Sequence, residues 1–152
     1  MYYINFLVMV MLDLISKKWI MTHLWIGESI SVFPFISFTY VLNSGIIFGF
    51  LAGKGETQRW ILSIISIMVL LILFIIVQSN KSKRLSSIAY TMIASGAFGN
   101  LFDRVMYGFV IDFIDFHIDD WHWPTFNLAD TEICIGIILI TLENIIVRYN
   151  NR

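Results

Sequence analysis

Apolar residues along the chain fall into four long segments separated by more polar connections. Residues 60–80 form a run of 21 residues without a charged side chain, and about 20 mostly apolar residues are enough for a helix to cross a bilayer. Residues 85–102 form a second uncharged run of 18 residues. The first and last segments are interrupted by only a few charged or amide side chains. The pattern predicts four transmembrane helices, at about 4–26, 59–79, 85–104 and 126–148.

The two longer connections also carry structural patterns. Residues 29–42 are rich in β-branched and aromatic side chains that partly alternate with polar ones, which is typical of short strands. Residues 43–53 predict a short apolar helix that lies in the membrane interface. We therefore expect an all-α membrane protein in one domain over 1–152, namely a four-helix bundle with a small sheet and an interfacial helix.

The composition narrows the class of protein. Hydrophobic residues make up 58% of the 152 residues and charged residues 14%, and a compact soluble domain cannot hide so much apolar surface. This argues against a soluble enzyme and against a disordered chain. The single cysteine, Cys134, allows no internal disulfide. The net charge of −1 gives no electrostatic footprint for nucleic acid.

Basic residues predict the orientation in the membrane. The short link at 80–84 carries three of them and the C-terminal end two more, and such residues concentrate on the cytoplasmic side. Both termini should therefore face the cytoplasm, and the connections at 27–58 and 105–125 should face outward. The first segment has no basic region before its apolar run and no small-residue cleavage site after it, so we expect a retained helix rather than a signal peptide.

Polar residues inside the predicted spans are the most informative positions, because burying an ionisable group in a membrane costs several kcal/mol unless it faces a partner or water. Asp13 and Lys17 are four residues apart and share one helix face. We interpret them as a structural ion pair.

A second polar group lies near the end of the third segment. Gly96, Asn100 and Asp103 share one face, and Gly96 and Gly99 allow a neighbouring helix to approach closely. Asn100 and Asp103 can then point into the bundle, with Arg104 beside them. Spacing alone leaves open whether this cluster fixes helix packing or serves a function.

Carboxylates near the start of the fourth segment suggest chemistry. Asn127 can cap the helix, but capping does not explain Asp130 and Glu132 in an apolar span. Asp112, 18 residues before Asp130, lies in an apolar run, so burial should raise its pKa. Two carboxylates that share a site cannot both ionise easily, so one retains a proton while the other acts as a base, as in an aspartic-protease dyad. The spacing permits this dyad without singling it out.

Several motifs together resemble one known family. DLISK, NSGIIF, GAFGNLFDRVMYGFVIDFI and FNLADTEICIG occur in the order and spacing of the bacterial lipoprotein signal peptidases, also called signal peptidase II. The resemblance runs from Asp13 to Gly136. One departure is Ser95, where a second glycine is expected before Gly96, although serine is also small.

The resemblance implies an aspartic endopeptidase of the bacterial cytoplasmic membrane that needs no metal or cofactor. It would remove the signal peptide from prolipoproteins, just before a cysteine that carries a diacylglyceryl group, and act as a monomer on substrates held in membrane lipid. Asp112 and Asp130 match the catalytic pair, and the segment 27–58 would clamp the substrate. Positions that support the pair or bind substrate are Asn43, Asn100, Asp103, Arg104 and Asn127. Asp13 and Lys17 match a structurally important pair.

Two alternatives stay open at this point. Asp103 could replace Asp112 as the partner of Asp130, but the adjacent Arg104 should hold Asp103 ionised, which suits an orienting group better than a group that shares a proton. A small proton-coupled transporter could use the same carboxylates, yet the second segment has no ionisable residue between Trp60 and Asn80. A purely structural scaffold would leave the predicted carboxylate pair without a purpose.

Two other features favour a structural interpretation. His117, Asp119, Asp120 and His122 could suggest a metal site, but we expect these side chains to be solvated and expect no metal. Cys134 should pack as a small hydrophobic residue within its helix.

Overall fold

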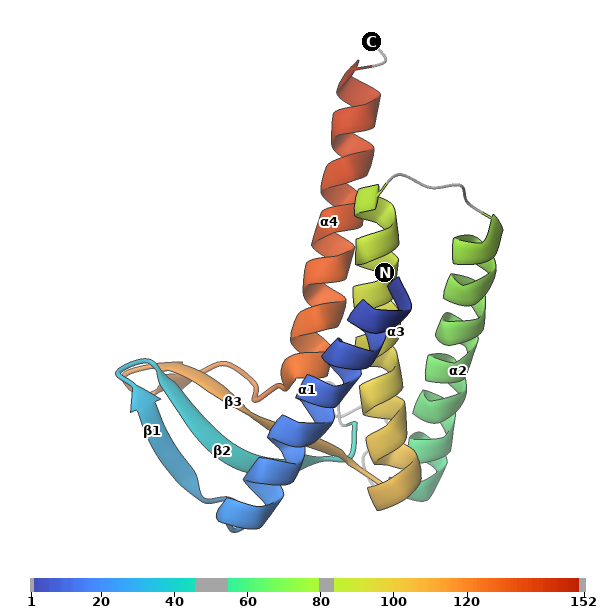
Figure 1. Cartoon of the computed structure of the whole chain (residues 1–152). Coiled ribbons are helices and arrows are strands. Elements are labelled where there is room, and N and C mark those ends of the chain that lie inside the picture. The colour runs from blue at the N-terminus through green and yellow to red at the C-terminus, as the bar shows by residue number, and fades with distance from the viewer. Residues whose placement is uncertain (1, 46–54, 80–83, 151–152) are drawn as a thin grey trace.

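The described residues of the computed structural model, 2–45, 55–79 and 84–150, form four helices and a four-stranded sheet (Figure 1). The helices are α1 (Tyr2–His23), α2 (Gly55–Ser79), α3 (Arg84–Tyr107) and α4 (Leu128–Asn150). The strands are β1 (Ser29–Phe33), β2 (Ile36–Asn43), β3 (Val110–Ile118) and β4 (Trp121–His122). The expected helical bundle with a small sheet is confirmed.

Helix α3 lies at the centre of the bundle. It packs against α1, α2 and α4, whereas α2 packs against α3 alone among the described elements. The sheet projects sideways from one end of the bundle, and the C-terminal end of α4 lies at the opposite end (Figure 1). This arrangement brings α1, α3, the sheet and the start of α4 together at one place.

The helix bounds differ slightly from those predicted. Helix α1 ends at His23, not near residue 26, and α4 begins at Leu128, after Asn127. Among the described residues, one helix is long and apolar enough by itself to cross a membrane, over Glu56–Gln78 in α2. The other three helices carry the polar side chains of the site described below, which lowers their mean hydropathy.

The sheet is antiparallel, with its strands in the order β1-β2-β3-β4. The strands predicted within 29–42 are confirmed. The connection at 105–125, within which the sequence predicts no strand, contains β3 and β4. Asn43 ends β2, and residues 44 and 45 are not helical either, so the helix predicted over 43–53 does not begin at Asn43; its other residues, 46–53, lie outside the described part of the chain.

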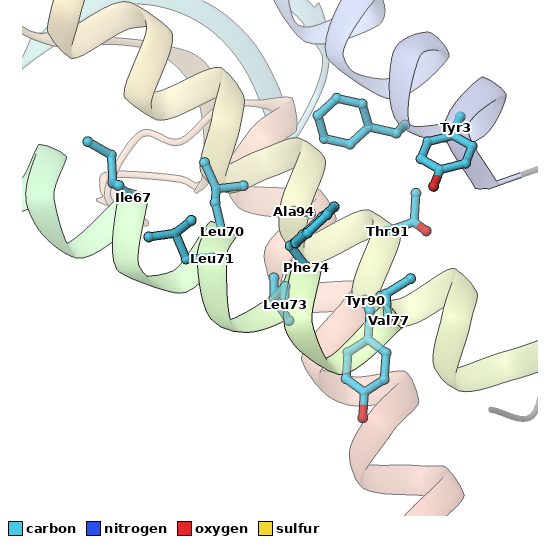
Figure 2. A pocket seen from close by; sticks show the side chains of 11 residues that line it. Tyr3, Ile67, Leu70, Leu71, Leu73, Phe74, Val77, Tyr90, Thr91 and Ala94 are labelled. Carbon is cyan, nitrogen blue, oxygen red and sulfur yellow. The ribbon is translucent and has the colours of Figure 1, made fainter. Parts of the chain in front are cut away.

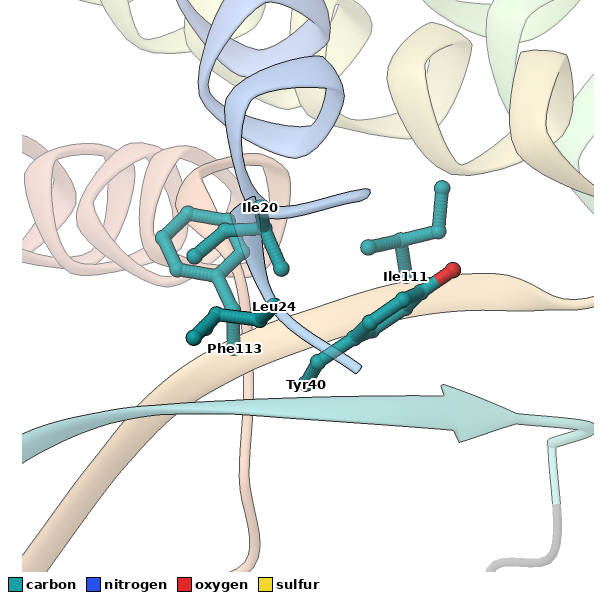
Figure 3. Packing of buried hydrophobic residues seen from close by; sticks show 5 residues of the cluster. All are labelled: Ile20, Leu24, Tyr40, Ile111 and Phe113. Carbon is teal, nitrogen blue, oxygen red and sulfur yellow. The ribbon is translucent and has the colours of Figure 1, made fainter. Parts of the chain in front are cut away.

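A small apolar core fixes the sheet to the bundle. Ile20 and Leu24, at the end of α1 and just beyond it, point toward Tyr40 of β2 and toward Ile111 and Phe113 of β3 (Figure 3). All five side chains are buried. This packing holds the middle of the sheet against α1, and therefore fixes the position of the intervening Asp112.

Glycines allow α3 and α4 to pack closely, as predicted for Gly96. A methyl group added at Gly96 would lie 2.2 Å from the carbonyl oxygen of Ala129, and one at Gly136 would lie 2.8 Å from the carbonyl oxygen of Ala89. Backbone atoms cannot move aside as a flexible side chain can. The helix pair therefore requires glycine at these positions.

Replacing Gly96 by alanine should lower the free energy of unfolding by roughly 1–3 kcal/mol, the usual cost of overpacking. Denaturant unfolding in detergent measures this. Cys134→Val is the control on α4, and the expected change in the free energy of unfolding is within about 0.5 kcal/mol. Cys134 is exposed on the helix surface, so the expectation that it packs as a small hydrophobic residue is wrong. Equal stability of Gly96→Ala and the natural protein would contradict the close packing.

Candidate active site

Most of the polar residues singled out in the sequence meet where α1, α3, β3 and the start of α4 come together. Asp13 and Lys17 come from α1, Asn100 and Asp103 from α3, Asn43 and Asp112 from the sheet, and Asn127 and Asp130 from the start of α4. Six of these side chains are buried, and Asn43 and Asp130 are partly exposed. The following contacts join all eight into one network.

The start of α4 is held by a reciprocal cap. The side-chain oxygen of Asn127 accepts a hydrogen bond from the backbone N–H of Asp130 at 2.9 Å, and the backbone N–H of Asn127 donates to Asp130 Oδ2 at 3.3 Å. Ala129 donates its N–H to Asp13 Oδ1 at 3.0 Å. These bonds satisfy N–H groups that the first turn of a helix leaves unpaired. Capping therefore aims the Asp130 carboxylate back toward Asn127.

Asp112 is held between two amide side chains. Asn43 Nδ2 donates to Asp112 Oδ2 and Asn127 Nδ2 donates to Asp112 Oδ1, each at 2.7 Å. Burial raises the pKa of Asp112 from 3.8 to about 6, and the negative charge of Asp130 adds to the rise, although the two amide hydrogen bonds oppose it. The expected desolvation of Asp112 is confirmed, since its side chain is 1% exposed.

Asp130 receives one further amide donor. Asn100 Nδ2 donates to Asp130 Oδ1 at 2.7 Å. Asn127 thus contacts both carboxylates, Asp112 through its side chain and Asp130 through its backbone. Because the donors are neutral amides, they orient the two carboxylates without supplying a positive charge that would keep both ionised.

Lys17 lies at the centre of the buried charges. Its Nζ is 2.8 Å from Asp13 Oδ2, 2.8 Å from Asp103 Oδ2 and 3.3 Å from Asn100 Oδ1. The predicted pairing of Asp13 with Lys17 is confirmed. Because a lysine ammonium has three hydrogens and Asn100 Oδ1 can only accept, these contacts fix which side of the Asn100 amide faces Asp130.

The structure corrects the partner expected for Asp103. Its cation is Lys17 on α1, not the adjacent Arg104, whose Nη1 instead donates to the backbone oxygen of Asn100 at 3.3 Å. Asp103 Oδ2 also accepts the backbone N–H of Ile111 at 3.2 Å. Asp103 is therefore held in an ion pair with Lys17. Asp112 is the carboxylate that shares a contact residue, Asn127, with Asp130, which favours Asp112 as the partner of Asp130.

The two histidines lie away from this network. Ser37 Oγ and His117 Nε2 are 3.0 Å apart, and His122 Nδ1 lies 2.9 Å from Asp115 Oδ1. His117 is partly buried, so the expectation that it is simply solvated is wrong. Within the described part of the chain, no three His, Cys, Asp or Glu residues lie close enough together to hold a metal ion.

An apolar cavity of about 550 Å³ lies between α1, α2 and α3 (Figure 2). Phe6 of α1, Phe74 of α2 and Tyr90 of α3 are among its lining residues. Its described lining residues include no carboxylate, lysine, arginine or histidine, and none of them belongs to the polar network.

A buried carboxylate, Asp112, and a partly exposed one, Asp130, are both oriented by amide donors in a bundle with a largely apolar outer surface, which is the arrangement expected of an aspartic peptidase of the membrane. The family model described as signal peptidase (SPase) II matches residues 5–146. The chain belongs to this family, whose members remove signal peptides from prolipoproteins.

Relatives and solved structures agree with this assignment. The lipoprotein signal peptidase of Yersinia enterocolitica is 49% identical over 138 residues, which cover 90% of this chain and 82% of the relative. That of Blochmanniella pennsylvanica is 43% identical, with 90% and 84% covered. A solved structure described as a bacterial membrane enzyme has 32% identity and a TM-score of 0.88, and the match covers 99% of this chain and 91% of the other.

Proposed function

We propose that this chain is an intramembrane aspartic endopeptidase that removes the signal peptide from diacylglyceryl-modified prolipoproteins, just before the lipidated cysteine. The catalytic pair is Asp112 and Asp130. The observation that carries the proposal is the position of Asn127, which contacts both carboxylates at once. Family membership supports the substrate class.

In this proposal water is the nucleophile and the two carboxylates divide the proton transfers. Burial raises the pKa of Asp112, so Asp112 holds the shared proton and Asp130 is the base. Asp130 takes a proton from water as the water oxygen bonds to the scissile carbonyl carbon, and Asp112 gives its proton to the carbonyl oxygen. When the C–N bond breaks, the proton on Asp130 passes to the leaving nitrogen and a hydroxyl proton of the intermediate returns to Asp112.

The remaining residues of the network orient this pair. Asn43, Asn100 and Asn127 hold the carboxylates, and Lys17 with Asp13 and Asp103 holds Asn100. Arg104 donates a hydrogen bond to the backbone oxygen of Asn100 on the same helix, α3. None of these residues exchanges a proton with the substrate in the proposal.

All four helices span the bacterial cytoplasmic membrane in this proposal, with both termini in the cytoplasm and the sheet outside. The helices are 22–25 residues long, which is about 33–38 Å at 1.5 Å per residue. Leu7 of α1, Leu71 of α2 and Ile145 of α4 are each 58–59% exposed, which suits contact with lipid better than contact with water. The chain acts as a single domain over 1–152 and as a monomer.

The lipid on the substrate explains why the pair lies at the sheet end of the bundle. Diacylglyceryl chains buried in the outer leaflet hold the adjacent peptide bond at the membrane surface, which reduces the entropic cost of positioning it. The segment 27–58, which includes β1 and β2, would clamp the peptide from outside.

The test of the substrate class compares a diacylglyceryl-modified peptide with the same peptide unmodified, using purified protein in detergent or liposomes. Because the acyl chains concentrate and position the substrate, kcat/KM for the modified peptide should be at least about tenfold higher. Equal rates for both peptides would contradict the substrate assignment even if proteolysis remained.

Removing the amide of Asn43 should change the pH dependence of cleavage. The Asn43 hydrogen bond stabilises the ionised form of Asp112 and so lowers the pKa of Asp112; Asn43→Ala raises that pKa. The pair then keeps its shared proton to higher pH, and the alkaline limb of the kcat/KM profile should move up by about one pH unit. Ser37→Ala, on the same strand but bonded to His117, should leave the limb in place. A shift to lower pH in Asn43→Ala would contradict the assigned roles.

A proton-coupled transporter is the second candidate, since it too would use buried carboxylates. A path for protons needs polar or ionisable side chains along it. Residues 60–79 of α2 have no ionisable side chain, and the cavity beside α2 is apolar, which argues against such a path. Uptake assays in proteoliposomes, run beside the cleavage assay, separate the two candidates.

A further inference from the structure

Glu132 is a buried carboxylate that the proposed mechanism does not use. It lies on α4, two residues after Asp130, and its side chain contacts α3, where Ser95 Oγ is 2.7 Å from Glu132 Oε2. Ser95 is also the position at which the sequence departs from the motif of the family. The two unexpected residues therefore contact each other.

The hydrogen atoms available at Ser95 indicate the protonation state of Glu132. Ser95 Oγ also lies 2.9 Å from the backbone oxygen of Met92, which can only accept a hydrogen bond. The single hydroxyl hydrogen cannot make a full-strength hydrogen bond to both Met92 and an ionised Glu132, and the remaining neighbour of Ser95 Oγ, Met9 Sδ at 3.5 Å, is only a weak acceptor. Both contacts are satisfied if Ser95 donates to Met92 and accepts from a protonated Glu132.

The surrounding charges agree with a neutral Glu132. Among the described residues, Asp13 and Lys17 of α1 are the charged groups that act on Glu132 electrostatically. Lys17 is already paired with two carboxylates, Asp13 and Asp103, so its single positive charge would have to offset three negative charges if Glu132 were ionised as well.

We propose that Glu132 is a protonated carboxylic acid that donates to Ser95, and that this bond is a positioning contact for the catalytic pair. Ser95 precedes Asn100 on α3 by five residues, about 7.5 Å along the helix, and Glu132 follows Asp130 on α4. The Ser95–Glu132 bond and the close contact at Gly96 thus fix the register of α3 against α4 next to the bond from Asn100 to Asp130. This role rests on the function proposed above.

Infrared difference spectroscopy tests the protonation state without turnover. The spectrum of the natural protein minus that of Glu132→Gln, near neutral pH, should show the carbonyl band of one neutral carboxylic acid. If only bands of an ionised carboxylate were lost, the proposal would be overturned.

Kinetics test the positioning role. Glu132→Ala should lower kcat by about tenfold, the effect of losing one buried hydrogen bond, with little change in KM, whereas Glu132→Gln should restore kcat because its amide can still donate to Ser95. The matched control is Glu143→Ala, because Glu143 accepts a hydrogen bond from Ser86 and so joins the same two helices far from the site. A kcat for Glu132→Ala equal to that of Glu143→Ala would overturn the positioning role.

A double-mutant cycle separates this role from a general effect on folding. Ser95→Ala and Glu132→Ala should be non-additive in kcat and in unfolding temperature, since either change removes the same bond. Additive effects would overturn the pairing. Failure of the natural protein to cut a lipid-modified peptide would contradict the proposed function alone, because the spectra and the unfolding cycle are measured without activity.

Discussion

Proteins with Asp112→Asn or Asp130→Asn are expected to remain folded and to lose at least about 10³-fold in kcat on a lipid-modified peptide, within the range for removing a general acid or base. Asparagine keeps the shape of aspartate but can neither take a proton from water nor give one to the carbonyl oxygen. The loss should therefore appear in kcat, with substrate binding largely retained. Cleavage followed at saturating substrate measures it.

Asp115→Asn is the matched control for this experiment. Asp115 lies on β3 like Asp112 and is also buried, but it contacts His122 and Thr39 and no residue of the pair. Asp115→Asn should keep most of the activity. The same series tests Asp103 as the alternative partner of Asp130. If Asp103→Asn lost as much kcat as Asp130→Asn while Asp112→Asn stayed active, Asp103 and not Asp112 would be the second catalytic aspartate.

Replacing Lys17 by methionine should have the largest effect on stability. Lys17 is 1% exposed and is the cation for both Asp13 and Asp103, so its loss leaves two buried carboxylates without compensation. Breaking a buried ion pair in this way costs roughly 3–5 kcal/mol. The unfolding midpoint in detergent should fall sharply, and the remaining folded protein should be less active because Asn100 loses the contact that orients it.

Lys18→Met is the control for that substitution. Lys18 is the next residue on α1 and is exposed, so the same chemical change there should leave stability nearly unchanged. Similar unfolding midpoints for the two variants would show that Lys17 does not carry the buried network.

The helices could be predicted from the sequence because a long apolar run has few other stable structures in a membrane. Their ends were less predictable, since α4 begins only where Asn127 and Asp130 cap each other. Strand β3 was missed for a physical reason. Residues 110–113 are buried on both faces of the sheet, so the alternation that reveals a half-buried strand is absent.

Within the site, too, some contacts could be predicted from the sequence and others could not. The pairing of Asp13 with Lys17 could be predicted because helix geometry sets it locally. The contact between Lys17 and Asp103 and the bond from Asn43 to Asp112 join segments far apart in the chain, and no local pattern encodes them. For the same reason, spacing alone allowed Asp112 and Asp130 to be a pair but could not select them, and the motif resemblance was needed.

The most direct measurement is a structure of the protein bound to a peptide analogue in which a tetrahedral carbon bearing a hydroxyl group replaces the scissile carbonyl. If Asp112 and Asp130 jointly hold one proton and one water, that hydroxyl should lie within hydrogen-bond distance of a carboxyl oxygen of each. A bound analogue whose hydroxyl contacts only one of the two aspartates, or neither, would contradict the account.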